Sequence, residues 1–202
     1  SMLWDELERR AEAHPLPTYA LITDVGNDVV YRNTPEQTTA WVDTCVQRLR
    51  ACDARIVMTG LPIESLRRLS VVPFVIARTM LFPRSLITLD YVLKTSETLN
   101  DMVHELAVRR GVTLCDPRLE WYGVDPIHVR RRHWREAYAG MLREWFDEGD
   151  ARREVEPPRV ASRLRTLWYL QRVPAQRWVC GIEQRGVQPA ITLRDGSTVS
   201  LY

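Results

Sequence analysis

Apolar positions recur along this chain with two spacings, and each spacing predicts a different kind of element. Over residues 2–13 they repeat every three to four positions, which predicts an amphipathic helix that two prolines then end. A continuous apolar run over residues 19–23 predicts a strand that is buried on both faces, as in a parallel sheet. Similar short runs predict two further strands over residues 55–60 and 112–115.

Helices are predicted in the segments between and after these strands. The second helix starts at Thr34, which forms a capping-box pattern with Gln37, and it continues to about residue 51. A long helix over residues 85–110 ends before a glycine, and a last helix covers residues 129–148. Strands that alternate with helices are typical of an α/β fold with a parallel, doubly wound sheet.

Apolar stripes predict which helix side chains face the core. In the helix that starts at Thr34, the predicted stripe consists of Trp41, Cys45 and Leu49, with Val42 and Val46 beside it. In the last helix the predicted inward residues are Trp134, Tyr138, Leu142 and either Trp145 or Phe146. Residues 63–83 are apolar but interrupted by prolines, which predicts short helices over the site side of the sheet.

The composition of the chain changes after Gly149. A charged stretch over residues 150–158 predicts a linker, and a short helix is predicted to follow it over residues 160–171. Two strand-like segments then flank a turn at Gly186 and predict a β-hairpin; they cover residues 177–184 and 188–193. We therefore expect an α/β domain over residues 1–149 and a C-terminal extension over residues 150–202.

Composition narrows the class of protein. A chain of 202 residues with 45% hydrophobic and 27% charged residues is typical of one globular domain that buries about 70% of its unfolded surface. No apolar run approaches the ~20 residues of a membrane span, and the acidic start does not resemble a signal peptide, so we expect a cytoplasmic protein. A net charge of +2 argues against general attraction to nucleic acid. Lys94 is the single lysine among 28 basic residues, which fits a GC-rich bacterial genome.

The cysteines and histidines of the chain are not spaced as in a metal site or a redox site. The four cysteines have no C-x-x-C spacing, so we expect reduced thiols; they are Cys45, Cys52, Cys115 and Cys180. His133 is off the helical face of His128, which argues against a two-histidine metal site. No phosphate loop or dinucleotide fingerprint occurs, so the sequence predicts neither a metal nor a cofactor.

Asp125 and His128 are the strongest candidates for chemistry. An Asp three residues before a His can accept the Nδ1 hydrogen of the imidazole and leave Nε2 free as a base. The alternative is a loop histidine whose neighbour Asp125 only caps the helix that is predicted to begin near residue 129.

Gly26 and Asn27 form a second candidate, directly after the first apolar strand. They would lie at the carboxyl edge of the sheet, where open α/β sheets bind ligands. Asn is a good oxyanion donor, and a histidine base with an oxyanion donor makes up most of an acyl-transfer site. The alternative is a tight turn in which Asn27 adopts a positive φ.

These two stretches resemble the SGNH (GDSL-type) hydrolases, a family of flavodoxin-like esterases and lipases. The family's G-x-N-D block matches Val25-Gly26-Asn27-Asp28, with Val25 in the first glycine position. Its D-x-x-H block matches Asp125-Pro126-Ile127-His128, and the resemblance covers roughly residues 17–147. It implies a three-layer sandwich around a mostly parallel sheet.

The resemblance also implies roles for individual residues. His128 would be the general base, Asp125 would orient it, and Asn27 with Gly26 would bind the oxyanion of a small ester or acylated substrate. The family nucleophile, a Ser in a G-D-S turn after a preceding strand, has no match before Asn27. Ser1 stands ahead of a helix as the family Ser does, but no strand precedes it to hold such a turn.

Two functional hypotheses follow. The first is a serine hydrolase whose first strand and nucleophile lie upstream, so that the chain by itself is weak or inactive. The second is a non-catalytic SGNH-like module that binds a carbohydrate, lipid or protein. A sheet without its first strand would expose an unpaired edge, which predicts association with a second copy of the chain.

Overall fold

The computed structural model describes residues 2–13, 17–81, 86–145, 174–179, 182–192, 196 and 198–202. The chain divides into two compact units: residues 16–153 form one, and residues 1–15 with residues 154–202 form the other. The sequence analysis assigned the N-terminal helix to the α/β domain, whereas here it groups with the C-terminal residues. The predicted linker over residues 150–158 and the predicted helix over residues 160–171 lie outside the described residues.

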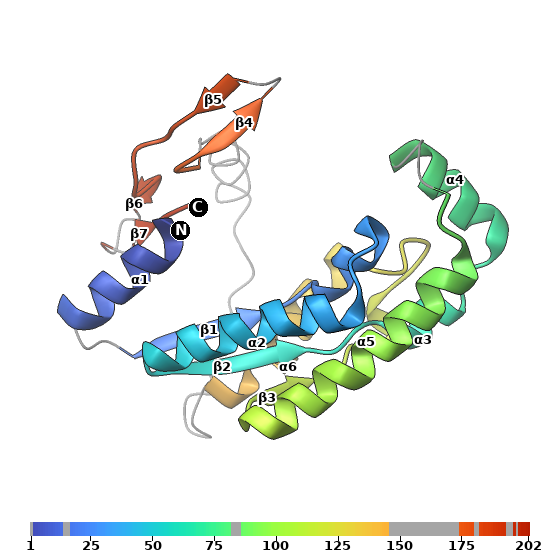
Figure 1. Ribbon diagram of the computed structural model, residues 1–202, viewed down its shortest axis with the longest axis horizontal. Helices are drawn as coiled ribbons and strands as arrows, with labels where there is room; N and C mark the ends of the chain where they lie inside the picture. Colours follow the sequence, from blue (N-terminus) through green and yellow to red (C-terminus); the bar gives the residue numbers. More distant parts are fainter. Residues whose placement is uncertain are drawn as a thin grey trace. The chain divides into compact units, whose positions relative to one another are not determined.

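The larger unit is built on a parallel sheet with the strand order β1-β2-β3 (Figure 1). The strands are β1 (Thr18–Ile22), β2 (Ala54–Thr59) and β3 (Thr113–Cys115). Ala20 pairs with Ile56, and Met58 pairs with Leu114. The predicted α/β architecture with a parallel sheet is confirmed, and all three strands lie where the apolar runs predict them.

Two helices, α2 (Pro35–Ala51) and α5 (Leu89–Arg110), pack against one face of this sheet. The predicted capping box of α2 is present: Thr34 Oγ1 accepts the Gln37 N–H at 3.2 Å, and Gln37 Oε1 accepts the Thr34 N–H at 3.1 Å. α5 starts four residues later than predicted because Thr88 caps it, accepting the Tyr91 N–H at 3.2 Å. It ends as predicted at Gly111, which has a φ of +56°.

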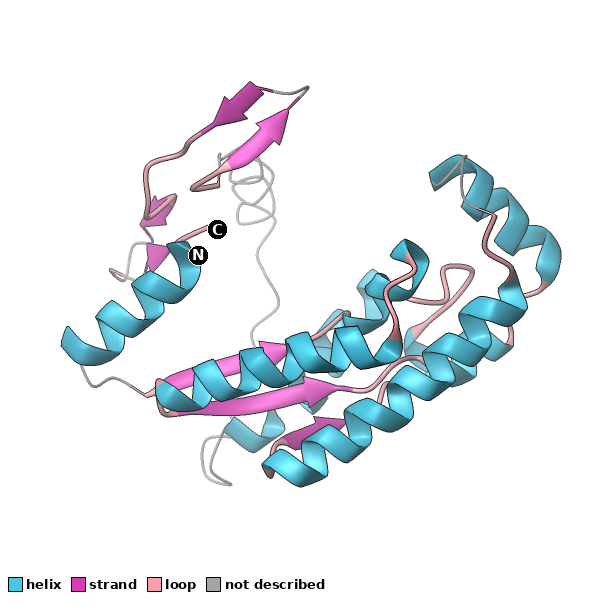
Figure 2. Ribbon diagram, viewed as in Figure 1, coloured by secondary structure: helices cyan, strands magenta, loops and turns pink. Residues whose placement is uncertain are grey.

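Strand residues alternate between two apolar clusters, so helices cover both faces of the sheet (Figure 2). Ile56 and Met58 pack with residues of α2 and α5, including Val46 and Leu99. Leu21 and Cys115 pack on the opposite face, against a cluster of Trp121, Tyr122, Ala137 and Met141. Burial of these side chains is the main force that holds the unit together.

The remaining elements of the larger unit are short. Their bounds are η1 (Val25–Tyr31), α3 (Ile63–Arg67), α4 (Val71–Leu81), η2 (Leu119–Trp121), η3 (Arg131–His133), α6 (Trp134–Met141) and η4 (Arg143–Trp145), where η denotes a 3₁₀-helix. The short helices predicted over residues 63–83 are present. α4 buries Phe74 but exposes four other large apolar side chains, Val71, Val72, Val75 and Ile76.

The predicted last helix over residues 129–148 is wrong in extent. Of the described part of this range, residues 129–145, only α6 is α-helical, because the Arg130 N–H donates to the Trp121 carbonyl at 2.8 Å and Arg131 starts a 3₁₀ turn. The predicted inward positions Trp134 and Tyr138 are about half exposed, while Ala137 and Met141 are buried. Trp134 stays at the surface with its indole N–H bonded to the Val129 carbonyl at 2.8 Å.

The predicted inward face of α2 is correct in part. Leu49 packs against the core, and Val42 and Val46, which were predicted beside the stripe, are buried. Trp41, however, is 52% exposed, while Thr38 and Thr39 are buried. The buried residues are compact, and such side chains let the helix approach the sheet more closely than a Trp would.

The smaller unit contains α1 (Met2–Ala13), which confirms the predicted first helix, and two hairpins. The hairpin strands are β4 (Arg177–Val179), β5 (Ile182–Gln184), β6 (Ile191–Thr192) and β7 (Thr198–Val199). The predicted pairing across Gly186 is wrong, because β4 pairs with β5 and β6 pairs with β7. The Gly186 N–H instead donates to the Pro174 carbonyl at 3.0 Å. No helix among the described residues of either unit is both long and apolar enough to span a bilayer.

Two valines of α5 test the assignment of the core. Val103 is fully buried and Val108 is 85% exposed on the same helix. We expect Val103→Ala to lower the free energy of unfolding by about 2 kcal/mol, because it removes two buried methyl groups and leaves a cavity. Val108→Ala should change it by less than about 0.5 kcal/mol. Urea unfolding of both variants measures the difference, and equal values would contradict the core described here.

Candidate functional site

The segment that carries Asp125 and His128 follows β3, and hydrogen bonds join its two ends. The Arg130 N–H donates to the Trp121 carbonyl at 2.8 Å, and Arg130 Nη2 donates to the Glu120 carbonyl at 3.2 Å. Trp121 is 1% exposed, and its indole N–H reaches the Glu136 carboxylate of α6 at 3.3 Å. These contacts fix both ends of the loop over residues 121–130 against the packed cluster beneath it.

The structure brings Asp125 and His128 into direct contact. Asp125 Oδ2 lies 2.7 Å from His128 Nδ1. Asp125 Oδ1 accepts two backbone N–H groups, from Ile127 at 3.1 Å and from His128 at 3.2 Å. One carboxylate therefore holds both the backbone of the loop and the orientation of the imidazole.

The capping alternative for Asp125 is partly correct, because its carboxylate does cap backbone N–H groups. However, those N–H groups belong to Ile127 and His128 in the loop and not to a helix, since the next helical element, η3, begins only at Arg131.

The charge of Asp125 suits this arrangement. Burial acts to raise the pKa of Asp125, but the hydrogen bonds from Ile127 and His128 outweigh it and hold the pKa below its usual range. An ionised carboxylate accepts the Nδ1 hydrogen, so a neutral His128 ring has its lone pair on Nε2. Nε2 has no hydrogen-bond partner among the described residues, and the side chain is 65% exposed. The ring can therefore accept a proton from a group outside this loop.

Gly26 and Asn27 lie in η1, which directly follows β1. The chain turns into η1 at Asp24, whose φ is +59°, and the Asn27 N–H donates to the Asp24 carbonyl at 3.0 Å. The tight-turn alternative is therefore wrong in its detail, since the left-handed residue is Asp24 and not Asn27. The Gly26 N–H precedes the first bond of η1 and has no acceptor within it. The exposed Asn27 amide makes no hydrogen bond among the described residues.

Close packing explains the glycine at position 26. A Cβ there would lie 3.1 Å from Leu61 Cδ2, which is tighter than an ordinary carbon contact. Leu61 is buried and belongs to the core cluster under α2 and α5. A larger residue at position 26 would push η1 away from the end of β2.

The two candidate segments lie at the same edge of the sheet, since η1 follows β1 and the His128 loop follows β3 (Figure 1). Tyr122 links them electrostatically: burial, followed by the charges of Asp24 and Cys115, raises its pKa to about 12. Asn27 and His128 make no hydrogen bond with each other.

A second histidine–aspartate pair at this edge was not predicted from the sequence. His104 Nε2 of α5 lies 3.0 Å from Asp116 Oδ1, directly after β3. Asn100 Oδ1 accepts the Leu61 N–H at 2.8 Å. A Cβ at Gly60 would lie 2.5 Å from Asp116 Oδ1, so a larger residue there would displace the Asp116 side chain from His104. Asp116 and Gly60 each follow a strand, which was the available signal, whereas His104 lies within a helix.

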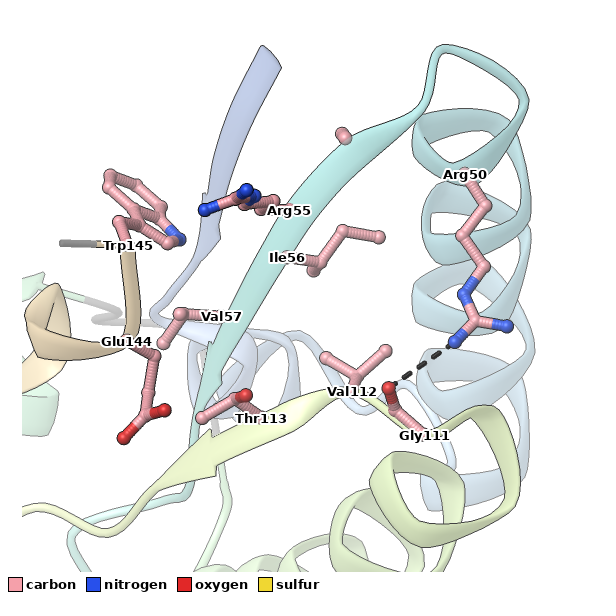
Figure 3. A pocket seen from close by; sticks show the side chains of 10 residues that line it. Arg50, Arg55, Ile56, Val57, Gly111, Val112, Thr113, Glu144 and Trp145 are labelled. Atoms are coloured by element: carbon pink, nitrogen blue, oxygen red, sulfur yellow. Dashed lines mark hydrogen bonds between the residues drawn. The ribbon is translucent and has the colours of Figure 1, made fainter. Parts of the chain in front are cut away.

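A cavity of about 370 Å³ lies at the opposite, amino-terminal edge of β2 and β3 (Figure 3). Arg55, Glu144 and Trp145 line it on one side of the sheet. Arg50 lies on the other side and donates to the Gly111 carbonyl at 3.3 Å. This cavity is therefore separate from the Asp125–His128 site.

Metal ligands and thiols do not gather at the site. Within the described ranges, no group of three or more His, Cys, Asp and Glu side chains could hold a metal ion. His133 Nδ1 lies 3.4 Å from Glu136 and not against His128. The free cysteines described are Cys45, Cys52 and Cys115; Cys180 and Ser1 lie outside the described residues.

In comparisons with known proteins, neither a protein-family model nor a curated protein matches this chain. The functional argument therefore depends on the geometry of the site and on the two short motifs.

The Asp125–His128 contact predicts the tautomer of the imidazole. At alkaline pH, where the ring is neutral, we expect His128 to be protonated on Nδ1 in the wild-type protein. Asp125→Ala should shift it toward the Nε2-protonated form, because the Nδ1 acceptor is lost. Long-range ¹H–¹⁵N correlation spectra measure both forms, with His133 as the internal control. Unchanged His128 signals in the variant would contradict the contact.

Proposed function

We propose that this chain carries the base and oxyanion parts of an SGNH-type hydrolase that cleaves a small ester or acyl group. His128 is the general base and acid, Asp125 orients it, and the Asn27 amide with the Gly26 N–H stabilises the oxyanion. The 2.7 Å contact between Asp125 and the Nδ1 of His128 is the observation that carries the proposal, because it leaves Nε2 available as the base.

The proposed reaction has two steps. A Ser hydroxyl attacks the carbonyl carbon while His128 Nε2 takes its proton, and Asn27 and Gly26 donate hydrogen bonds to the resulting oxyanion. The tetrahedral species collapses, the leaving alcohol receives the proton from His128, and an acyl-enzyme remains. Water then repeats the sequence and releases the acid. Asp125 stays ionised throughout and stabilises the imidazolium.

The nucleophile of this proposal is a Ser outside the described residues, in a strand that pairs with β1. β1 is an outer strand, since β2 is its one described neighbour in the sheet. A further strand there would make β1 central, in keeping with a flavodoxin-like three-layer sandwich. The helices on both faces of the sheet support a flavodoxin-like three-layer sandwich. A second copy of the chain is the other partner that the edge would accept, and size-exclusion chromatography distinguishes a dimer from a monomer.

A binding module without catalysis is the second candidate function. The observation that favours it is the free Nε2 of His128, because no nucleophile of the described residues is hydrogen-bonded to it. Labelling of the full-length gene product with a fluorophosphonate discriminates the two, since only an activated Ser reacts with this reagent. Labelling that depends on His128 would exclude the binding-only function.

Hydrolysis of short p-nitrophenyl esters by the full-length gene product tests the catalytic roles. We expect His128→Ala to lower kcat/KM by about 10²–10⁴-fold, because the general base is lost. Asn27→Ala should lower it by about 10²–10³-fold through the loss of an oxyanion donor.

His133→Ala serves as the control, because His133 lies close in the sequence but is paired with Glu136. Its rate should equal that of the wild-type protein. Equal rates for the wild type and His128→Ala would remove His128 from the mechanism.

A further inference from the structure

A cavity of about 340 Å³ borders the loop that carries Asp125 and His128. One wall is the corner between α3 and α4, and the other is the loop itself. The lining residues are Ser65, Arg68, Leu69, Ser70, Pro73, Leu119, Tyr122, Gly123, Val124 and Pro126. Ligand-binding pockets commonly start near this size, so the cavity can hold a small group of a bound molecule.

Arg68 is the single charged residue that lines this cavity. Its exposed guanidinium makes no ion pair or hydrogen bond with any other described residue. The neighbouring Arg67 differs, since it pairs with Glu97 of α5 at 2.7 Å and does not line the cavity. Arg68 therefore presents five N–H donors and a full positive charge to the space beside the loop.

Two residues that are themselves mostly buried bring hydroxyl groups to the same cavity. Ser65 is 6% exposed and Tyr122 is 7% exposed, and neither hydroxyl is hydrogen-bonded to another described residue. The raised pKa of Tyr122, about 12, keeps its phenol protonated and able to donate at neutral pH. Neither hydroxyl oxygen is fully buried, so both can donate to a group that enters the cavity.

The start of α4 adds further donors. The Ser70 carbonyl accepts the Phe74 N–H at 3.2 Å, so Ser70 directly precedes α4 and the N–H groups of Val71 and Val72 have no acceptor within the helix. The positive end of the helix dipole lies at the same corner as Arg68.

The described residues that line the cavity include no carboxylate. The charge of Asp24 acts on the Tyr122 hydroxyl and weakens its hold on an anion, so Arg68 must supply the main attraction; the Asp125 carboxylate is bonded to His128. The walls therefore offer donors and one positive charge, without a negatively charged group.

We propose that this cavity binds an oxyanion, a phosphate or carboxylate group carried by the substrate, and that Arg68 is a specificity-determining residue for it. The group is held by the Arg68 guanidinium, with the Ser65 and Tyr122 hydroxyls as further donors. The anion site itself does not rest on the proposed function. The assignment of the anion to the substrate does, because it depends on the cavity lying beside the His128 loop. It narrows the substrates to esters that bear a negative group beside the scissile bond.

Titration of the chain of 202 residues with inorganic phosphate and with butyl phosphate tests the anion site without any catalysis. Isothermal titration calorimetry and amide chemical shifts at constant ionic strength measure the binding. We expect saturable binding with shifts centred on residues 65–70 and 119–126, with butyl phosphate the tighter ligand if the anion belongs to a larger molecule. Tighter binding of free phosphate would assign the site to a free anion and contradict the substrate assignment.

Arg68→Gln should weaken the affinity for both ligands at least about tenfold, because a charge-assisted contact is lost. Arg67→Gln is the matched control, with the same change of charge one residue away, and should stay within about twofold. Tyr122→Phe should weaken binding without loss of the positive charge. Equal weakening by the Arg67 and Arg68 variants, or no saturation in the wild type, would overturn the proposal. If binding persists while His128→Ala hydrolyses esters at the wild-type rate, the proposed function fails and the anion site stands.

Discussion

The parallel direction of β1, β2 and β3 is the constraint on which the rest of the larger unit depends. Parallel pairing places the three carboxyl ends at one edge, so the segments that follow the strands must gather there. Those segments are η1, the stretch from Gly60 to Leu61, and the loop that carries Asp125 and His128. Every polar feature that we connect with function lies at this edge because of the strand direction.

Side chains pack closely at this edge. A Cβ at Gly26 would lie close to Leu61, and a Cβ at Gly60 would lie close to Asp116. The Leu61 N–H is in turn bound to Asn100 of α5, so the end of β2 is tied to the helix beside it. At both glycines a side chain would crowd a neighbouring side chain, and neither glycine has a positive φ. The positions of η1 and of the 116–130 segment are thus linked through the end of β2.

Local signals predicted the elements whose determinants are local. The capping box of Thr34, the glycine after α5 and the apolar runs of the strands all act within a few residues, and the structure contains each of them. The Asp125–His128 contact belongs to the same class because it spans three residues. Features set by distant partners were wrong or missed.

Three such features show why. The last helix is shortened by a bond from Arg130 to Trp121, which no helical periodicity reveals. Trp134 and Tyr138 followed the apolar pattern, but aromatic residues with polar tips are stable at a surface, and smaller residues occupy the core. The contact of His104 with Asp116 and the cavity beside Arg68 join elements that are far apart in the sequence.

The bond between Arg130 and Trp121 has a consequence for the residues inside the loop that it closes. A free segment would sample many conformations, and each substrate encounter would have to select the one in which Asp125 faces the ring of His128. Here the backbone is confined when the chain folds, with both carboxylate oxygens already engaged. The imidazole is thus preorganised before any ligand arrives, and little further ordering of this loop opposes binding.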